Sequence, residues 1–155
     1  MSKTLHSVAP WAVRATFLLS LVGLAISTYL TITHFEKQLL LCSSTGTIDC
    51  AAVTSSPQSY VAGIPVAALG LGFFVALTAL NSPWGWRLRA YWPHVVRFGL
   101  TLSAMAFVLW LVGAELLIID HICLWCTGVH VVTFALFAVL VNVAPTQLGW
   151  TSPSQ

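Results

Sequence analysis

The chain has 155 residues, of which 58% are hydrophobic and 6% are charged, and its formal net charge at pH 7 is +2. Soluble domains carry about a quarter charged residues, so this composition excludes an ordinary soluble protein and indicates an integral membrane protein. The small charge, without any basic stripe or basic motif, argues against a nucleic-acid partner.

Four stretches are apolar enough to cross a bilayer as helices, which takes about 20 residues each. We place them at residues 12–33, 62–81, 98–119 and 123–144. The apolar run of the first stretch is longer than the core of roughly 7–15 residues in a cleaved signal peptide, so we expect it to remain as a helix. The sequence therefore predicts an all-α, four-helix membrane bundle.

The positively charged residues predict the orientation of this bundle. Five of the six lie near the amino terminus or between the second and third helices: Lys3, Arg14, Arg87, Arg89 and Arg97. Lys and Arg stay on the cytoplasmic side, so we expect residues 1–11 and 145–155 to form cytoplasmic tails. The first and third loops then face the extracytoplasmic side, and we expect the first loop to cap the active site.

All four cysteines fall on that extracytoplasmic side, where disulfides persist. Cys42 and Cys50 lie in the first loop, and the seven residues between them, "SSTGTID", are mostly small and polar. We expect this segment to be flexible and able to swing toward the second pair. Cys123 and Cys126 form a Cys-x-x-Cys pair at the outer end of the fourth helix.

The spacing of the Cys-x-x-Cys pair suits a redox-active disulfide. Positions i and i+3 share one face of a helix, so the two thiols can approach to disulfide distance. Cys123 lies beside the unpaired N–H groups and the positive end of the helix dipole, which stabilise a reactive thiolate. Cys126, one turn deeper, is better placed to meet a molecule dissolved in the bilayer. We expect Asp120 to cap this helix.

The residues alone leave other interpretations open. Four thiolates can hold one Zn²⁺, which would make the chain a tetrathiolate metal-binding membrane protein, although the seven-residue spacing is awkward for such a site. Two static disulfides in a structural subunit are a further possibility. Haem attachment is disfavoured, because Thr127 follows the pair where that motif needs His.

In chain order these features resemble the vitamin K epoxide reductase family in its bacterial form. The shared pattern is four helices, Cys-x7-Cys after the first and Cys-x-x-Cys opening the last. Ser56 stands six residues after Cys50, where the family has Ser or Thr, and "GIPVAALG" from Gly63 is similar to the family's second-helix start. The resemblance covers roughly residues 12–143.

The resemblance implies an enzyme, a quinone-dependent disulfide oxidoreductase. It would oxidise a thioredoxin-like partner, reduce ubiquinone, menaquinone or a related quinone, and support disulfide formation in exported proteins. By position, Cys42 would take electrons from the partner and Cys50 would pass them to Cys123. The Cys123–Cys126 pair would then reduce the quinone, with Cys126 nearest the ring. The expected location is the bacterial inner membrane, with the chain crossing it several times.

The chain also departs from the family pattern. Many bacterial relatives carry a fused thioredoxin-like domain, whereas this chain ends at "TQLGWTSPSQ", so we expect a separate thiol partner on the extracytoplasmic side. Vertebrate members have Tyr four residues after the last cysteine, and this chain has His130 there. His can donate a hydrogen bond or a proton to a quinone oxygen, but the change argues against vitamin K epoxide as substrate.

Two further polar residues are candidates for quinone contact. Ser56 would hydrogen-bond a quinone carbonyl, or it would only start the turn before Pro57. Glu115 lies within the third helix, and an intramembrane carboxylate usually faces the bundle or water. It would supply protons or anchor the first loop, or it would simply reach the nearby interface. We expect His34 and His94 to be interfacial.

A related quinone-linked family, that of disulfide bond formation protein B, also has four helices and two cysteine pairs. In that family the Cys-x-x-Cys pair lies in the first outer loop and the spaced pair in the second. The reversed order in this chain argues against membership there.

Overall fold

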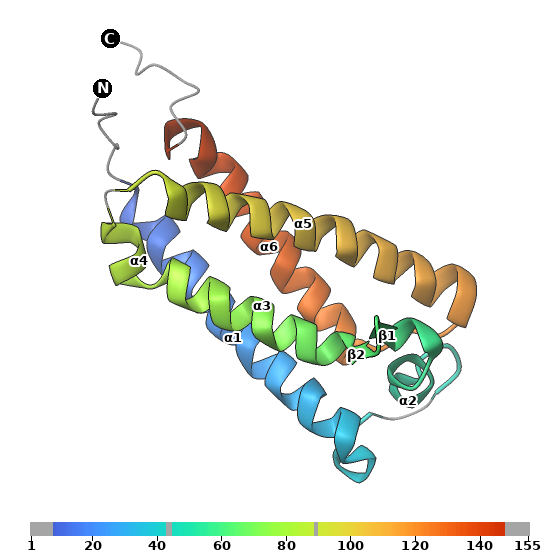
Figure 1. The fold of residues 1–155 in the computed structure, drawn as a ribbon. Helices are drawn as coiled ribbons and strands as arrows, with labels where there is room; N and C mark the ends of the chain where they lie inside the picture. Colours follow the sequence, from blue (N-terminus) through green and yellow to red (C-terminus); the bar gives the residue numbers. More distant parts are fainter. Residues whose placement is uncertain (1–7, 43–44, 89, 148–155) are drawn as a thin grey trace.

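The computed structural model describes residues 8–42, 45–88 and 90–147, most of which are helical. Four helices run side by side (Figure 1): α1 (Pro10–Phe35), α3 (Val66–Asn81), α5 (Trp92–Ala114) and α6 (Leu124–Gln147). Helix α1 packs against both α3 and α6, and α6 also packs against α5. The helical fold class expected from the composition is therefore present.

Three helices of the described ranges are long and apolar enough to cross a membrane: Pro10–Phe35, Trp92–Ile119 and Leu124–Pro145. Helix α3 is shorter, with 16 residues, and begins at Val66 rather than at residue 62 as expected. At 1.5 Å per residue it is about 24 Å long, less than the roughly 30 Å of a bilayer core.

A small hairpin explains the late start of α3. Strands β1 (Tyr60–Val61) and β2 (Ile64–Pro65) pair antiparallel, and the turn between them holds Ala62 and Gly63 at φ of 51° and 80°. Those angles cannot continue into a helix, and the residue before a proline is also pushed toward extended conformation. The helix consequently begins directly after Pro65.

Several other helix ends extend beyond the expected spans. Helix α5 begins at Trp92 with Pro93 in its first turn, a favourable position for proline, and α6 continues to Gln147. Residues 1–7 and 148–155 of the expected tails lie outside the described residues.

Arg97 therefore belongs to α5, and its expected place in the loop between the second and third helices is wrong. The side chain is only 2% exposed. Its guanidinium donates to the carbonyl of Leu80, lies 3.1 Å from His94 Nδ1 and stacks over the ring of Trp86 at 3.7 Å. These groups stabilise the buried cation in place of water, so Arg97 is a packing residue of this end of the molecule.

The inward face of α1 is made of small and hydroxyl side chains. Its buried residues recur every three or four positions: Ala12, Thr16, Ser20, Gly23, Ser27, Leu30 and Thr33. Asn81 Nδ2 of α3 donates to Ser20 Oγ at 2.9 Å, and Gly23 lies against the ring of Phe74. Small side chains at a contact let two helix backbones approach closely, as in membrane-spanning helix pairs.

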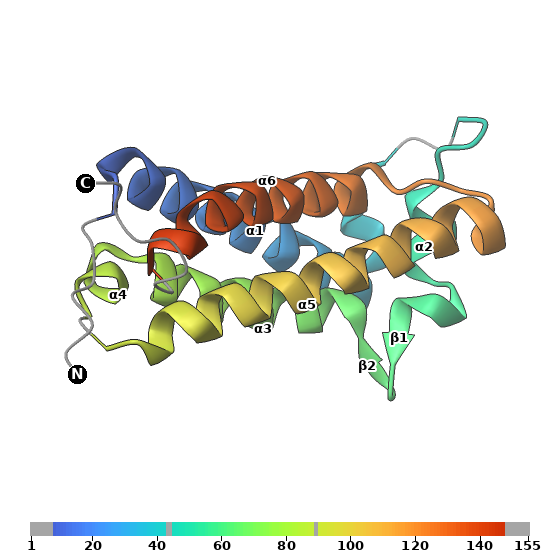
Figure 2. The ribbon, with the colours of Figure 1, turned by 90° about the horizontal axis from the view of Figure 1, so that it is seen from above.

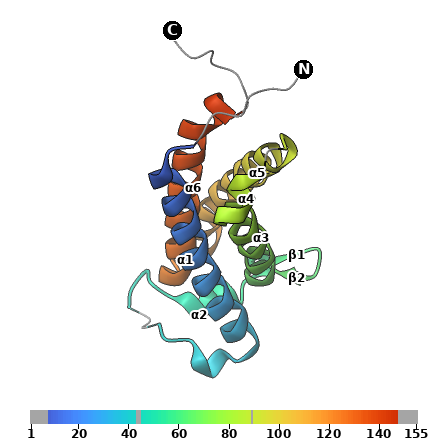
Figure 3. The same cartoon turned by 90° about the vertical axis from the view of Figure 1, so that its left-hand side faces the viewer.

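The connection between α1 and α3 gathers at one end of the long helices (Figures 2 and 3). It contains three short helices and the hairpin: η1 (Lys37–Leu39), α2 (Cys50–Thr54), η2 (Pro57–Ser59), β1 and β2. The short helix α4 (Pro83–Arg87) lies at the opposite end (Figure 2). The connection that contains Cys42 and Cys50 therefore lies at the end that carries α2.

Candidate redox site formed by two cysteine pairs

Cys42 and Cys50 form a disulfide, with their Cα atoms 6.0 Å apart. Cys50 is the first residue of α2 and is 1% exposed. Asp49 caps this helix, because its side chain accepts a hydrogen bond from Ala52 N at 2.9 Å. Cys42 is partly exposed. One sulfur of the bond is thus buried and the other is near the surface.

The second half of the first loop is tied to the segment before Cys123. Ile122 N donates to Thr47 O at 2.8 Å, and Asp49 N donates to Ile122 O at 3.2 Å. A turn at Gly46, with φ of 59°, brings Thr45 and Ile48 into a bridge. The expectation of a flexible segment is wrong for residues 45–49, because backbone pairing with a distant residue leaves no local pattern; residues 43–44 lie outside the described part of the chain.

The first half of the loop is anchored by aromatic side chains. Tyr29 Oη accepts from Leu41 N at 2.7 Å and donates to Leu39 O at 3.1 Å. Trp125 Nε1 donates to Leu41 O at 3.0 Å, and the rings of Tyr29 and Trp125 are 4.6 Å apart. Trp125 lies between the two cysteines of the Cys-x-x-Cys motif. The motif is therefore hydrogen-bonded directly to Leu41, the residue before Cys42.

These anchors bring the two cysteine pairs together. Cys50, Val53 and Cys123 form one buried apolar cluster, and Cys42 and Cys126 pack at its edge. Cys50 and Cys123 are 1% and 0% exposed. The juxtaposition of the two pairs is what the spacing and the expected topology predict.

Cys123 is itself the N-cap of α6. The backbone N–H of Cys126 donates to Cys123 Sγ at 3.3 Å, and Thr127 N donates to Cys123 O at 2.8 Å. Asp120, which we expected to cap this helix, is exposed and adopts a left-handed conformation with φ of 57° three residues earlier. The capping expectation for Asp120 is wrong, because Cys123 occupies the capping position of α6.

This arrangement favours the thiolate of Cys123. The hydrogen bond from the Cys126 thiol lowers the pKa of Cys123 below its ordinary value of 9.0, against the opposing effect of burial. Backbone N–H groups at the start of α6 act in the same direction. Cys123 therefore has the protonation chemistry of an exchange nucleophile.

Glu115 lies where the third long helix changes its winding. Residues Glu115–Ile119 form a π-helical turn, η3, at the end of α5. Such turns within α-helices occur frequently at functional sites. Glu115 is 6% exposed and lines the same cavity as Cys126. Glu115 consequently lies on the same cavity as the second cysteine pair.

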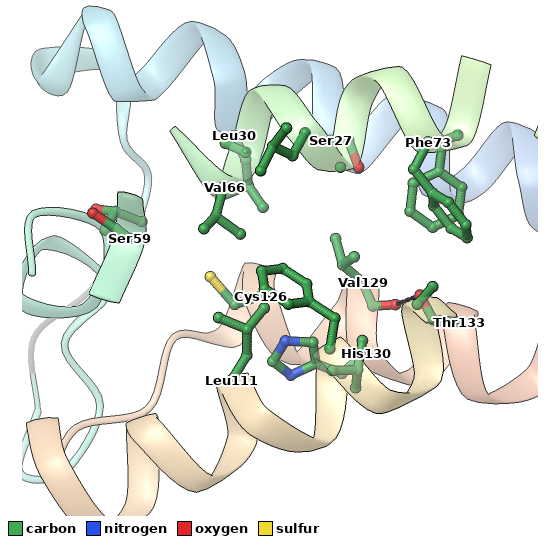
Figure 4. Close-up of a pocket in the computed structure, with 18 of the residues that line it drawn as sticks. Ser27, Leu30, Ser59, Val66, Phe73, Leu111, Cys126, Val129, His130 and Thr133 are labelled. Carbon is green, nitrogen blue, oxygen red and sulfur yellow. Dashed lines mark hydrogen bonds between the residues drawn. The ribbon is translucent and has the colours of Figure 1, made fainter. Parts of the chain in front are cut away.

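A cavity of about 360 Å³ opens beside Cys126. Along α6, Cys126, Val129, His130 and Thr133 share one face and line it, and the sulfur of Cys126 points into it (Figure 4). Other walls come from α1, α3 and α5 and are mostly apolar, with Phe73 and Leu111 among them (Figure 4). The cavity has the size and polarity of a small-molecule site, which are typically 300–1,000 Å³ and mostly apolar.

Three of the candidate residues from the sequence line this cavity, and Ser56 does not. Cys126, His130 and Glu115 line it. Ser56 is not among the lining residues, and its hydroxyl donates instead to Val53 O at 2.8 Å. Sequence reasoning did not find the hydroxyls of Ser27, Thr54 and Ser59, nor His34, which all line the cavity. Ser27, Leu30 and His34 recur at helical spacing on α1, which was the available signal.

The comparison with known families agrees with the resemblance seen in the sequence. The family model described as the vitamin K epoxide reductase family matches residues 14–141, which include all four cysteines, helices α3 and α5, and most of α1 and α6. This match extends over most of the chain. The protein therefore belongs to the vitamin K epoxide reductase family, and it is a membrane oxidoreductase with a disulfide bond.

Proposed function

We propose that the protein is a membrane thiol-to-quinone oxidoreductase. It oxidises a separate thioredoxin-like partner, reduces a quinone of the membrane and so supports disulfide formation in exported proteins. The observation that carries this proposal is that Cys50 and Cys123 pack together in one buried cluster, while Cys126 lines an apolar cavity beside it.

The exposure of the four sulfurs supports an order of exchange. A thiolate of the partner attacks Cys42, the partly exposed member of the disulfide, and Cys50 leaves as a thiolate. The partner's second thiol then displaces Cys42 and becomes part of the partner's own disulfide. Cys50, which is buried against Cys123, attacks it when Cys123 and Cys126 are joined by a disulfide, and Cys126 leaves as a thiolate. Cys42 then attacks Cys50, which re-forms the Cys42–Cys50 disulfide and releases Cys123 as a thiolate. The pair nearest the cavity thereby becomes reduced.

The chemistry of the cavity suits a quinone ring. Its walls are mostly apolar, and the polar groups that line it include the thiol of Cys126, the imidazole of His130 and the carboxyl group of Glu115. When bound there, the quinone would supply a two-electron, two-proton acceptor. Cys126 would face the ring, and His130, one turn further along α6, would hydrogen-bond an oxygen.

The proposed location is the bacterial inner membrane, with the cysteines on the extracytoplasmic side. Disulfide exchange with exported proteins requires an oxidising compartment. Exposed aromatic residues at the α4 end, Trp84, Tyr91 and Trp92, and the exposed Arg87 support placing that end at the cytoplasmic interface.

The test is stopped-flow absorbance on the purified protein in detergent, mixing a dithiol-reduced sample with a soluble quinone analogue. We expect rapid quinone reduction by the unaltered protein and none by Cys126→Ser. Thermal unfolding of Cys126→Ser establishes that the variant is folded. Quinone reduction at the normal rate in this variant would overturn the proposal.

A second variant separates the two cysteine pairs. Cys42→Ala should lose turnover with a reduced thioredoxin-like protein and keep turnover with a small dithiol. If both reductants fail equally, Cys42 is not the site of partner attack.

The tetrathiolate zinc alternative is disfavoured by the Cys42–Cys50 disulfide, which removes two of the four ligands that it needs.

A further inference from the structure

A second polar pair closes the side of the cavity nearest the loop. His34, in the last turn of α1, lines the cavity, and its Nε2 lies 2.9 Å from the hydroxyl of Tyr60 in β1. The two rings contact edge to face, with centroids 5.2 Å apart. Tyr60 is 45% exposed, whereas His34 is partly buried. The pair therefore connects the outer surface with the interior of the cavity.

The proposed reaction requires a proton from outside the cysteine pair. Oxidation of Cys123 thiolate and Cys126 thiol forms one S–S bond, releases two electrons and releases one proton, that of Cys126. Reduction of a quinone to a hydroquinone takes up two electrons and two protons. The second proton therefore comes from another group, which solvent must reprotonate in each cycle, because the Cys123 thiolate has no proton to give.

His130 and Glu115, the other acid–base groups of the cavity besides the thiols, are buried. His130 is 9% exposed and Glu115 is 6% exposed. They can hold a proton beside the thiols, but both are far less exposed than Tyr60. His34 differs from both, because its hydrogen-bond partner Tyr60 lies at the surface.

We propose that His34, held by Tyr60, passes the second proton from the extracytoplasmic solvent into the cavity and hydrogen-bonds the quinone there. This inference rests on the proposed function. His34 approaches on α1, and Cys126 and His130 approach on α6, so the cavity presents polar groups from two walls. An imidazole both accepts and donates a proton near neutral pH, which a relay requires.

Several charged or titratable groups surround His34. Tyr60 faces it from β1, and Glu36 and Lys37 follow it in the chain. Across the cavity lie Glu115 of η3 and Cys126 and His130 of α6. A change in pH acts on these groups as well, so the test compares variants over a full pH profile.

The first experiment measures the rate of disulfide formation between Cys123 and Cys126 in a single turnover with a soluble quinone analogue. His34→Gln keeps a hydrogen-bonding group but cannot relay a proton. We expect a decrease of at least about tenfold, since general acid catalysis contributes roughly 10²–10⁴-fold. The dependence of the rate on pH should also differ from that of the unaltered protein. Lys37→Gln, which removes an exposed charge that does not line the cavity, is the matched control.

Chemical rescue separates proton transfer from a structural role. His34→Gly should be slow, and free imidazole in the buffer should restore a substantial part of the rate. Tyr60→Phe keeps the ring contact and removes the hydrogen bond, so we expect a smaller decrease than in His34→Gln. Failure of imidazole to restore His34→Gly, together with an unchanged pH profile in His34→Gln, would overturn the inference.

A further readout does not depend on turnover. In Cys126→Ser protein, diethylpyrocarbonate should modify His34, and a saturating quinone analogue should protect it, as mapped by mass spectrometry. Equal modification with and without the analogue would contradict contact between His34 and the quinone. If the unaltered protein itself reduces no quinone, the proposed function fails; if it does and His34→Gln behaves normally, only this inference fails.

Discussion

The sulfur of Cys123 accepts a hydrogen bond from the backbone N–H of Cys126 at 3.3 Å, so the first cysteine of the Cys-x-x-Cys pair is the N-cap of α6. A cap is normally an oxygen of Ser, Thr, Asp or Asn. Here a sulfur takes the place of that oxygen. The backbone N–H groups that it caps also stabilise the thiolate of Cys123.

Cys126→Ala should raise the pKa of Cys123, whereas Cys126→Ser should raise it less. Alanine removes the hydrogen bond that is the main cause of the lowered pKa, and serine keeps a donor at that position. In both variants Cys123 is the single free thiol of the described chain while the Cys42–Cys50 disulfide remains. Ultraviolet thiolate absorbance against pH gives the two midpoints. Identical midpoints would show that the Cys126 side chain does not set the pKa.

The direction of this effect follows from the sign of the shift. A lowered pKa means that the thiolate persists to lower pH than that of an ordinary cysteine and is lost as pH falls through the folded-state pKa. Exchange with a small disulfide reagent should therefore continue in the unaltered protein at pH values where Cys126→Ala has become slow.

Gly23→Ala should destabilise the protein by about 1–3 kcal/mol, the usual cost of overpacking. A Cβ at this position would overlap the ring of Phe74, which lies in the core between α1 and α3 and also lines the cavity. The control is Gly72→Ala in α3, where a Cβ meets nothing within 4 Å. Thermal unfolding in detergent should show a lower midpoint only for Gly23→Ala.

Tyr29→Phe should loosen the segment that carries Cys42. The change removes the acceptor of Leu41 N and the donor to Leu39 O together. A typical hydrogen bond contributes about 1 kcal/mol, and an amide left unpaired loses its protection. Hydrogen exchange should become faster at Leu41. Trp125→Phe, which removes only the donor to Leu41 O, should change the exchange of that amide less.

Arg97→Lys should lower stability and leave the thiol chemistry of the folded protein unchanged. Lysine cannot reproduce the planar contacts with Leu80, His94 and Trp86 at the end remote from the cysteines. We expect a loss of about 1–3 kcal/mol, consistent with disrupting a buried polar network. Arg87→Lys, at an exposed position, is the control and should unfold at the normal temperature. A slower quinone reduction per folded molecule would contradict a purely structural role.

Much of the architecture follows from local properties of the sequence. Hydropathy is a sum over neighbouring residues, so it located the long helices to within a few positions, apart from the early start of α5 at Trp92. The order and spacing of the four cysteines along the chain are enough to point to the family. The apolar character of a helix and the spacing of a motif are both read within a short window of chain.

Only the tertiary structure decided the contacts between distant segments. The hairpin that shortens α3, the pairing of Thr47 and Asp49 with Ile122, and the burial of Arg97 join residues whose local sequence gives no sign of a partner. The same holds for His34, which from the sequence was an interfacial histidine and in the structure lines the cavity beside Tyr60. The physical reason is that hydrogen bonds and packing between helices depend on how whole elements meet. The residues next to a position in the chain do not specify which distant residue it will contact.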